Sequence, residues 1–414
     1  MSALSPILHV GIDISSKTNV AACLDQEGKL VGTPTSFLNN QTGAEALEEW
    51  IVDLCRERAA GSVKIATEAT SVYDWHLADY LSESAKLLPF RHELYRFNPK
   101  LIKHFKKALK DTDKTDGQDA IAIAQRLRFG ELPHPYHSLK EYQPLQRLTR
   151  YRLHLINEIV REKSFFLSHF FLKSSSLATE KPIKRVLGAT SRAIIAECLS
   201  GEEIAQMPLP ELTALIVKAS KNRYEHPEDI AALVQRVSRE SYRIKPSLAR
   251  SLDFILAASL RTLRAHQESL QETDRAIADE VKGITHTLTT IKGIGPVYAA
   301  GILAETGNGR FPTDDAMAKY AGLWWPRRQS GEFEAEDRYL KRAGNAYLRY
   351  YLVEAANSLR VHNEEYKTFY QKKYAEARTH HHKRALVLTA RKLVRLVFAL
   401  RKTGQVYDPD KHRS

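Results

Sequence analysis

The sequence predicts an α/β domain built on a mixed sheet, followed by a mostly helical half. Short apolar segments alternate with helical patterns up to about residue 135, which is typical of a sheet covered by helices. Beyond residue 140 the chain changes to long charged segments whose apolar residues recur at helical spacing. The fold class predicted is therefore α/β plus α.

Residues 7–38 predict three strands that form a meander. The strands are ILHVGID, NVAACLD and LVGTPTSF, and QEGK supplies a glycine-containing hairpin turn between the second and the third. Gly61 is the expected C-cap of the helix that follows. The other elements predicted for this domain are helices at 42–61, 73–84, 98–110 and 116–130 and strands at 62–68 and 86–90.

The second half predicts two long helices, over 144–171 and 248–281, with leucines and isoleucines close to heptad spacing. Such helices form either an antiparallel hairpin or a coiled-coil dimer arm. The irregular stretch of about 174–245 between them is interpreted as an insertion at the tip of the arm. The predicted domains are thus 1–135, the helical arm 140–285, and a C-terminal domain 286–405 with basic amphipathic helices at 344–361 and 383–402.

The C-terminal domain opens on the turn KGIGP, which joins two helical patterns. Gly293 and Gly295 permit a tight turn with exposed backbone N–H groups, the sequence form of a helix-hairpin-helix that holds a DNA phosphate. The alternative is an ordinary glycine turn with no ligand, because Gly-x-Gly turns are common.

Composition and charge restrict the function classes. The 414 residues are 43% apolar and 27% charged, as in ordinary globular proteins, and carry a net charge of +13. That excess predicts a polyanionic partner, nucleic acid ahead of acidic membrane, with a solvated basic surface as the alternative. We expect no export signal, no membrane span and a reducing cytoplasmic compartment, because long apolar runs are lacking and the three cysteines form no CxxC motif.

Four carboxylates stand where a divalent metal could be held. Asp13 ends the first predicted strand and Glu68 ends a central one, while Asp116 and Asp119 are three residues apart on one helix face. Magnesium prefers oxygen ligands that converge from different elements. Each acid has a simpler alternative: a turn residue for Asp13, and helix caps for Glu68 and Asp116. Asp111 and Asp113, in an approach loop, are not expected to be ligands.

A basic stripe precedes these acids. The lysines at 100, 103, 107 and 110 share one face of the helix at 98–110, and another follows in the loop. We interpret them as phosphate contacts beside the metal site, and the alternative is a solvated face. The candidate contacts in this region are Lys100, Lys103, Lys107, Lys110 and Lys114.

These segments resemble a known family. GIDISSK, TEATSVYDWHLADYL and NPKLIKHFKKALKDTDKTDGQDA are similar to the RuvC-like (RNase H-like), DEDD-type domain of insertion-sequence 110 transposases, and TTIKGIGPVYAAGILAETGNGRF and RRQSGEFEAEDRYLKRAGNAYLRYYLVEAANS resemble its transposase domain. The resemblance covers about 8–165 and 250–360, and 174–245 is an expansion relative to compact members. It implies that Asp13, Glu68, Asp116 and Asp119 bind Mg²⁺, with Mn²⁺ as the alternative ion.

The resemblance also implies a chemistry. Ser330, in RRQSG, corresponds to the family's nucleophile, and attack on a phosphodiester would give a phosphoserine link to DNA. Arg327, Arg328, Arg342 and Arg349 are candidate phosphate contacts. The implied partners are element and target DNA, a noncoding guide RNA and further copies of the chain in a dimer or tetramer, in the cytoplasm at the nucleoid.

Three functions remain open from the sequence. The first is a DNA transposase or recombinase that acts through Ser330 with Mg²⁺. The second is a RuvC-like, Mg²⁺-dependent nuclease resembling Holliday-junction resolvases, in which water attacks. The third is an inactive nucleic-acid-binding regulator, and the complete set of four acids argues against it.

Overall fold

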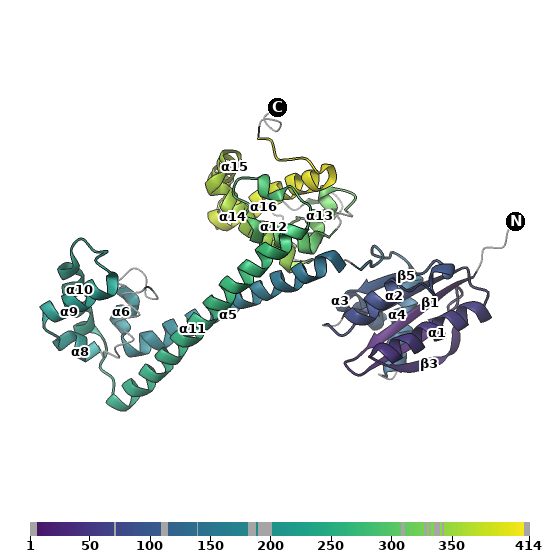
Figure 1. Cartoon of the computed structure of the whole chain (residues 1–414), viewed down its shortest axis with the longest axis horizontal. Helices are drawn as coiled ribbons and strands as arrows, with labels where there is room; N and C mark the ends of the chain where they lie inside the picture. The colour runs from purple at the N-terminus through teal and green to yellow at the C-terminus, as the bar shows by residue number, and fades with distance from the viewer. Residues whose placement is uncertain are drawn as a thin grey trace. The chain divides into compact units, whose positions relative to one another are not determined.

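The computed structural model describes residues 6–69, 72–108, 115–138, 140–180, 188, 201–307, 311–326, 329–330, 333–334, 340–341 and 343–409, with residues 108, 329–330 and 333–334 described by their backbone alone. The chain divides into two compact units, 1–140 and 141–414 (Figure 1). The 3₁₀ helix η2, Lys140–Tyr142, lies at the boundary. In the part of the chain described, no helix has the length and apolar character needed to cross a membrane.

The first unit contains a five-stranded mixed sheet, which confirms the predicted α/β class. Its strands are β1 (Ile7–Ile14), β2 (Thr18–Leu24), β3 (Leu30–Leu38), β4 (Ser62–Glu68) and β5 (Glu93–Phe97). The order is β3-β2-β1-β4-β5, in which β1, β4 and β5 are parallel and β2 and β3 are antiparallel additions. The predicted meander of β1 to β3 is thus present.

Helices cover both faces of this sheet. They are α1 (Gln41–Glu57), α2 (Trp75–Ser82), α3 (Pro99–Ala108) and α4 (Asp116–Phe129). Alternate residues of β1, such as Val10 and Ile12, share a core with α1 and α2, while residues of β4 and β5 form a second core with α3 and α4. Because side chains alternate along a strand, Gly11 and Asp13 lie on the face that α4 covers.

Two predictions for this unit are wrong. The segment predicted as a strand at 86–90 contains the 3₁₀ helix η1 (Leu88–Phe90), and the strand is β5. Pro89 lacks the N–H that a ladder needs, and Arg91 is left-handed with φ 43°, so a strand cannot run through this segment. Helix α1 ends at Glu57, before the predicted cap at Gly61.

The second unit is mostly helical, and two long helices run through it. Helix α5 (Gln143–Lys173) and helix α11 (Pro246–Glu280) lie side by side and antiparallel (Figure 1). Arg152 pairs with Asp274 at 2.5 Å, and Lys173, at the other end of α5, pairs with Asp253 near the start of α11. The antiparallel hairpin is therefore formed within one chain, whereas a coiled coil remains a prediction.

The described part of the tip region of about 174–245 is mostly helical. It contains α6 (Ser175–Glu180), α8 (Gly201–Gln206), α9 (Leu209–Ser220) and α10 (Pro227–Glu240). Their apolar residues share one core with α5 and α11, including Leu212, Val234 and Leu260. This shared core packs the tip against the end of the hairpin.

The described residues of the rest of the unit form short turns and further helices. These are η3 (Val281–Gly283), η4 (Leu288–Thr290), α12 (Pro296–Thr306), α13 (Asp314–Ala321), α14 (Ala346–His362), α15 (Glu364–Glu376) and α16 (His381–Thr403), with a two-stranded pairing of β6 (Gln329–Ser330) and β7 (Phe333–Glu334). Helices α14 and α16 confirm the two predicted basic helices, and α13 and α15 were not predicted. The helix-hairpin-helix is not confirmed, because the three-residue η4 precedes KGIGP.

Candidate functional site

Asp13 and Glu68 come from neighbouring parallel strands. Ile12 of β1 pairs with Thr67 of β4, so the two acids occupy adjacent positions at the same edge of the sheet. Both side chains are partly buried and lie on the face that α4 covers. The carboxyl ends of parallel strands meet at one edge, and this geometry brings two acids together that are 55 positions apart in the sequence.

Gly11 allows α4 to approach β1 closely. A Cβ atom at Gly11 would lie 2.3 Å from both the Ala120 carbonyl oxygen and the Ala124 nitrogen, so only glycine fits here. The first turn of α4 carries Asp116 and Asp119. The close approach of the helix therefore brings its two acids toward the end of β1, where Asp13 lies.

The N-cap of α4 is Thr115 and not Asp116, which was the alternative role for that acid. Thr115 is extended at φ −135°, and its side-chain oxygen accepts a hydrogen bond from the Gln118 N–H at 3.2 Å. Asp116 is the first residue of the helix itself. The carboxylate of Asp116 is thus not needed for capping, and Asp116 is free of that structural role.

The four acids act on one another electrostatically. The pKa of Asp13 is raised from its ordinary value of 3.8 to about 6, first by burial and then by the negative charges of Asp119, Asp116 and Glu68. The ammonium of Lys106 lowers the pKa of Asp13 and so opposes them. A carboxyl with three carboxylate neighbours is partly protonated near neutral pH unless a cation offsets the repulsion.

Lys106 is a site residue that the sequence analysis missed. Its Nζ lies 2.8 Å from Asp119 Oδ1, and the two side chains are 29% and 25% exposed. Helix α3 has several lysines at similar spacings, and only the packing of α3 beside α4 selects the one that reaches the acids.

Among the described residues, no three His, Cys, Asp or Glu side chains stand close enough to form a metal site in this arrangement.

A basic pocket adjoins the acids. It has a volume of about 370 Å³ and is lined by Glu68, Pro99, Lys103, Lys106 and Lys107. Two lysines of the predicted stripe, Lys103 and Lys107, therefore face the acidic end of β4. Lys100 is exposed and does not line the pocket. Lys110 and Lys114 lie outside the described residues.

The candidate residues of the second unit are less completely described. Ser330 lies in β6, where its backbone pairs with Phe333 of β7. Arg327, Arg328 and Arg342 lie outside the described residues. Arg349 donates from Nη1 to the Ala321 carbonyl oxygen at 3.0 Å, which ties α14 to the end of α13.

The glycines of KGIGP form a turn that packs against α14. Gly293 has φ 108°, and a Cβ there would lie 3.2 Å from the Cβ of His362 and 3.3 Å from a methyl of Leu359. Gly295 is the N-cap of α12 and has open space around it. Phosphate contact at this turn stays a prediction.

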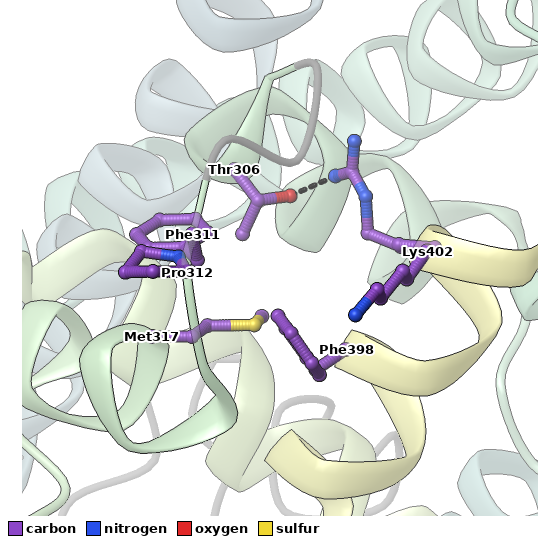
Figure 2. A pocket seen from close by; sticks show the side chains of 7 residues that line it. Thr306, Phe311, Pro312, Met317, Phe398 and Lys402 are labelled. Carbon is purple, nitrogen blue, oxygen red and sulfur yellow. Dashed lines mark hydrogen bonds between the residues drawn. The ribbon is translucent and has the colours of Figure 1, made fainter.

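A cavity in this unit lies at the C-terminal end of α12. It measures about 200 Å³ and is lined by Thr306, Phe311, Pro312, Met317, Phe398, Arg401 and Lys402 (Figure 2). Arg401 donates hydrogen bonds to Thr306 Oγ1 and to the Gly307 carbonyl oxygen at the C-terminal end of α12. Cations are favoured at that end of a helix dipole. None of the predicted site residues lines this cavity.

Comparisons with known proteins identify the family of the chain. A model described as a transposase, of the DEDD type of IS110 elements, matches residues 10–170. A second model, described as transposase IS116/IS110/IS902 family, matches residues 285–371. The two together span more than half of the 414 residues. The first contains the four acids, and the second contains Ser330.

Single relatives agree with the family models over shorter lengths. The uncharacterised 43.6 kDa protein of insertion element IS110 from Streptomyces coelicolor is 29% identical over 154 residues, which is 37% of this chain and 37% of that protein. A solved structure of T. thermophilus RuvC in complex with a Holliday junction substrate is matched over 32% of this chain and 99% of that chain, at 13% identity and a TM-score of 0.24, too low to equate the two folds. The chain belongs to the IS110 family of transposases.

Proposed function

We propose that this chain is a DNA transposase that cuts and rejoins the strands of a mobile insertion element. The observation that carries the proposal is the approach of Glu68, Asp116 and Asp119 to Asp13, from three elements in all. Burial and then the charges of these three acids raise the pKa of Asp13. Crowded carboxylates cost stability, so a site that retains them needs a cation to offset their charge. Family membership supports the same activity.

The cation that suits these donors is Mg²⁺, with Mn²⁺ as the alternative. Hard carboxylate oxygens are the ligands that both ions accept, and Asp13, Glu68, Asp116 and Asp119 would supply them. Bound there, a divalent ion would polarise the scissile phosphate and stabilise the departing 3′ oxygen. Asp13 must first lose its proton, and Asp119 must separate from the Lys106 ammonium.

The lysines of α3 have a matching role on the nucleic-acid side. Lys103, Lys106 and Lys107 line a pocket together with Glu68, so a phosphodiester held by their ammonium groups lies beside the acids. When Lys106 leaves Asp119, it becomes available to a phosphate oxygen. One side chain then neutralises the acids before DNA binds and the phosphate afterwards.

Ser330 is the proposed nucleophile. Its hydroxyl oxygen would attack the phosphorus, forming a Ser–O–P bond as the bond from phosphorus to the 3′ oxygen breaks. The serine proton passes to a general base, and the 3′ oxygen leaves as a hydroxyl after taking up a proton. The phosphoserine keeps the bond energy for rejoining. Arg327 and Arg328, two and three residues before Ser330 in the sequence, are proposed phosphate contacts.

The proposed partners follow from charge and from the resemblance to the family. A net charge of +13 suits a load of element ends and target DNA together with a noncoding guide RNA. Further copies of the chain, as a dimer or tetramer, would bring Ser330 of one subunit to the acids of another. Such a complex would act in the cytoplasm at the nucleoid.

A covalent adduct tests this chemistry. The purified chain is incubated with Mg²⁺ and end-labelled DNA carrying the ends of its element, then denatured and examined for label that migrates with protein. We expect an adduct from the natural chain, none from Ser330→Ala, and none from Asp13→Asn. Ser251→Ala is the matched control, because Ser251 is exposed and its hydroxyl donates to the Ser247 carbonyl oxygen of its own helix.

Each outcome discriminates between the functions. Cleavage that survives Ser330→Ala with no adduct would establish hydrolysis by a RuvC-like nuclease. Binding without cleavage in any condition would favour an inactive regulator. Strand exchange at the natural rate in Asp13→Asn would exclude the metal site at these acids.

A further inference from the structure

The junction of α15 and α16 brings aromatic and basic side chains together on an exposed surface. His380, at φ 52°, reverses the chain, so that the first turn of α16 lies beside the last turns of α15. We call this feature the α15–α16 surface and define it by Tyr370, Tyr374, Arg378, His381, His382, Lys383 and Arg384. Most of it lies beyond residue 371, where the second family match ends.

Aromatic rings from the two helices form a platform. Tyr370 Oη lies 2.7 Å from His382 Nδ1, and the ring centroids of Tyr374 and His381 are 5.2 Å apart. His381 Nδ1 also lies 2.9 Å from the Tyr374 carbonyl oxygen, which fixes the imidazole against α15. Tyr374 remains 45% exposed. A rigid, half-exposed ring of this kind can accept another flat ring on its face.

Tyr370 connects the platform to α14. The Arg360 guanidinium lies 5.1 Å from the centroid of the Tyr370 ring, a cation–π contact from α14. The centroids of Tyr370 and Tyr374 are 5.9 Å apart. The platform is thus held by contacts from α14, α15 and α16 and is in place before any ligand binds.

Three cations close to His380 in the sequence have no acidic partner among the described residues. Arg378, Lys383 and Arg384 are exposed, and none of them forms an ion pair with any carboxylate in the described part of the chain. Other basic residues nearby are paired within their own helix, Lys367 with Glu364 at 3.2 Å and Lys373 with Glu376 at 2.5 Å. These three unpaired charges flank His380 in the sequence, two residues before it and three and four residues after it.

We propose that the α15–α16 surface binds single-stranded nucleic acid, with a base stacked on Tyr374 and flanking phosphates on Arg378, Lys383 and Arg384. Unpaired cations attract phosphates, and every base offers a flat face to an aromatic ring. A duplex keeps its bases stacked on one another and cannot use the ring, so the platform selects unpaired strands. The proposal rests on the proposed function only in requiring a nucleic-acid partner.

Binding of short labelled strands tests this surface without any cleavage. Fluorescence anisotropy is measured with the full chain carrying Ser330→Ala, so that a failure of the strand-transfer chemistry leaves the result intact. The probes are a single-stranded RNA, a single-stranded DNA of the same sequence and the corresponding DNA duplex. The two single-stranded probes distinguish RNA from DNA as the natural ligand, and the duplex measures general electrostatic attraction.

Two kinds of variant separate stacking from charge. Tyr374→Ala is expected to weaken single-strand binding about ten-fold and Tyr374→Phe to leave it unchanged, since the stacking of one base is worth on the order of ten-fold in affinity. The triple variant Arg378→Ala, Lys383→Ala, Arg384→Ala should reduce the slope of log affinity against log salt by about 2, as expected for three lost phosphate contacts.

Matched controls come from the start of α11. Tyr242 is 83% exposed, and the exposed Arg243, Lys245 and Arg250 follow it within eight residues of sequence and form no ion pairs with described residues. Tyr242→Ala and the triple variant Arg243→Ala, Lys245→Ala, Arg250→Ala remove one exposed aromatic ring and three cations outside the α15–α16 surface. Equal losses from both sets, an equal loss for the duplex, or unchanged single-strand affinity in Tyr374→Ala would overturn the proposal. Circular dichroism establishes that each variant is folded.

Discussion

The Nζ of Lys106 lies 2.8 Å from Asp119 Oδ1, so a side chain of α3 neutralises one member of the acidic set on α4. The same ammonium lowers the pKa of Asp13, which three neighbouring carboxylates raise. A divalent ion bound by these acids would compete with Lys106 for Asp119. The ion pair therefore links the charge of the acids to the position of α3.

Removing the Lys106 charge should raise the pKa of Asp13. In Lys106→Gln the opposing charge is lost, so Asp13 should titrate above the value of about 6 that it has with the lysine in place. The Mg²⁺ affinity should rise as well, because no ammonium competes for Asp119. Carbon NMR titration of the Asp13 carboxyl and calorimetry measure the two effects. Lys100→Gln, on the exposed side of the same helix, is the control, and equal behaviour of the two variants would exclude a special role for Lys106.

Asp13 should make the folded state less stable as pH rises. Its pKa is about 6 in the folded protein and 3.8 by its ordinary value, so the folded state binds the proton more tightly between these values. The free energy of unfolding therefore falls as pH increases from about 3.8 to about 6.

Asp13→Asn removes this effect. Without metal, the variant should exceed the natural chain in stability at pH 7.5 by roughly 1 kcal/mol, after allowance for solvent screening, and should match it near pH 4. Thermal unfolding in EDTA at the two pH values measures the difference. Asp53→Asn, which changes an exposed acid on α1, should alter the stability by the same amount at both pH values. A variant that is less stable than the natural chain at pH 7.5 would contradict the repulsion described.

Gly11→Ala should loosen the contact between β1 and α4. The new Cβ would lie 2.3 Å from backbone atoms of Ala120 and Ala124, and a helix backbone cannot yield as a flexible side chain can. Such overpacking costs about 1–3 kcal/mol of stability, measurable by urea unfolding. Adduct formation should fall too, because the acids of α4 move away from Asp13. Gly283→Ala, where a Cβ meets no atom within 4 Å, should have little effect on either measurement.

Arg150→Met should destabilise the second unit. Arg150 binds the fully buried carboxylate of Glu305 through two hydrogen bonds of 2.7 and 2.9 Å, and Asn345 donates to the same carboxylate at 2.6 Å. This network joins α5 to α12 and to the start of α14. Loss of the guanidinium leaves Glu305 buried without its cation, at a cost of about 3 kcal/mol.

An exposed ion pair on the same helix is the control for this prediction. Arg161 is 77% exposed and pairs with Glu158 at 2.9 Å. Arg161→Met should cost less than about 1 kcal/mol, because water replaces the lost partner. Equal costs at Arg150 and Arg161, measured by denaturant unfolding, would show that Glu305 is not dependent on its cation.

Sequence patterns were sufficient to predict the elements that depend on neighbouring residues. The strands of the meander, the lengths of α5 and α11 and the start of α4 were predicted, because strand alternation, helical periodicity and capping depend on neighbouring residues. The prediction of a strand at 86–90 was wrong because it rested on the local apolar pattern alone. Pro89 and the left-handed Arg91 interrupt a strand there, and the strand begins only at β5.

Side-chain partners, by contrast, required the packed structure. Lys106 has the same chemistry as the other lysines of α3, and nothing in the local sequence distinguishes the one that reaches Asp119. The run of histidines at 380–382 does not by itself indicate that two of these rings contact tyrosines, because that contact depends on the turn between two helices.

Residue type and short-range spacing were enough to predict the α/β class, the two long helices and the four acids as candidates. Whether the two helices form a hairpin within one chain was left open. The tertiary structure decided that Asp13 and Glu68 are adjacent at one sheet edge, that Gly11 admits α4 beside them, and that Lys106 neutralises Asp119. These relationships join residues up to about a hundred positions apart in the chain. Only the pairing of strands and the packing of helices bring such residues within the few ångströms over which charges and hydrogen bonds act.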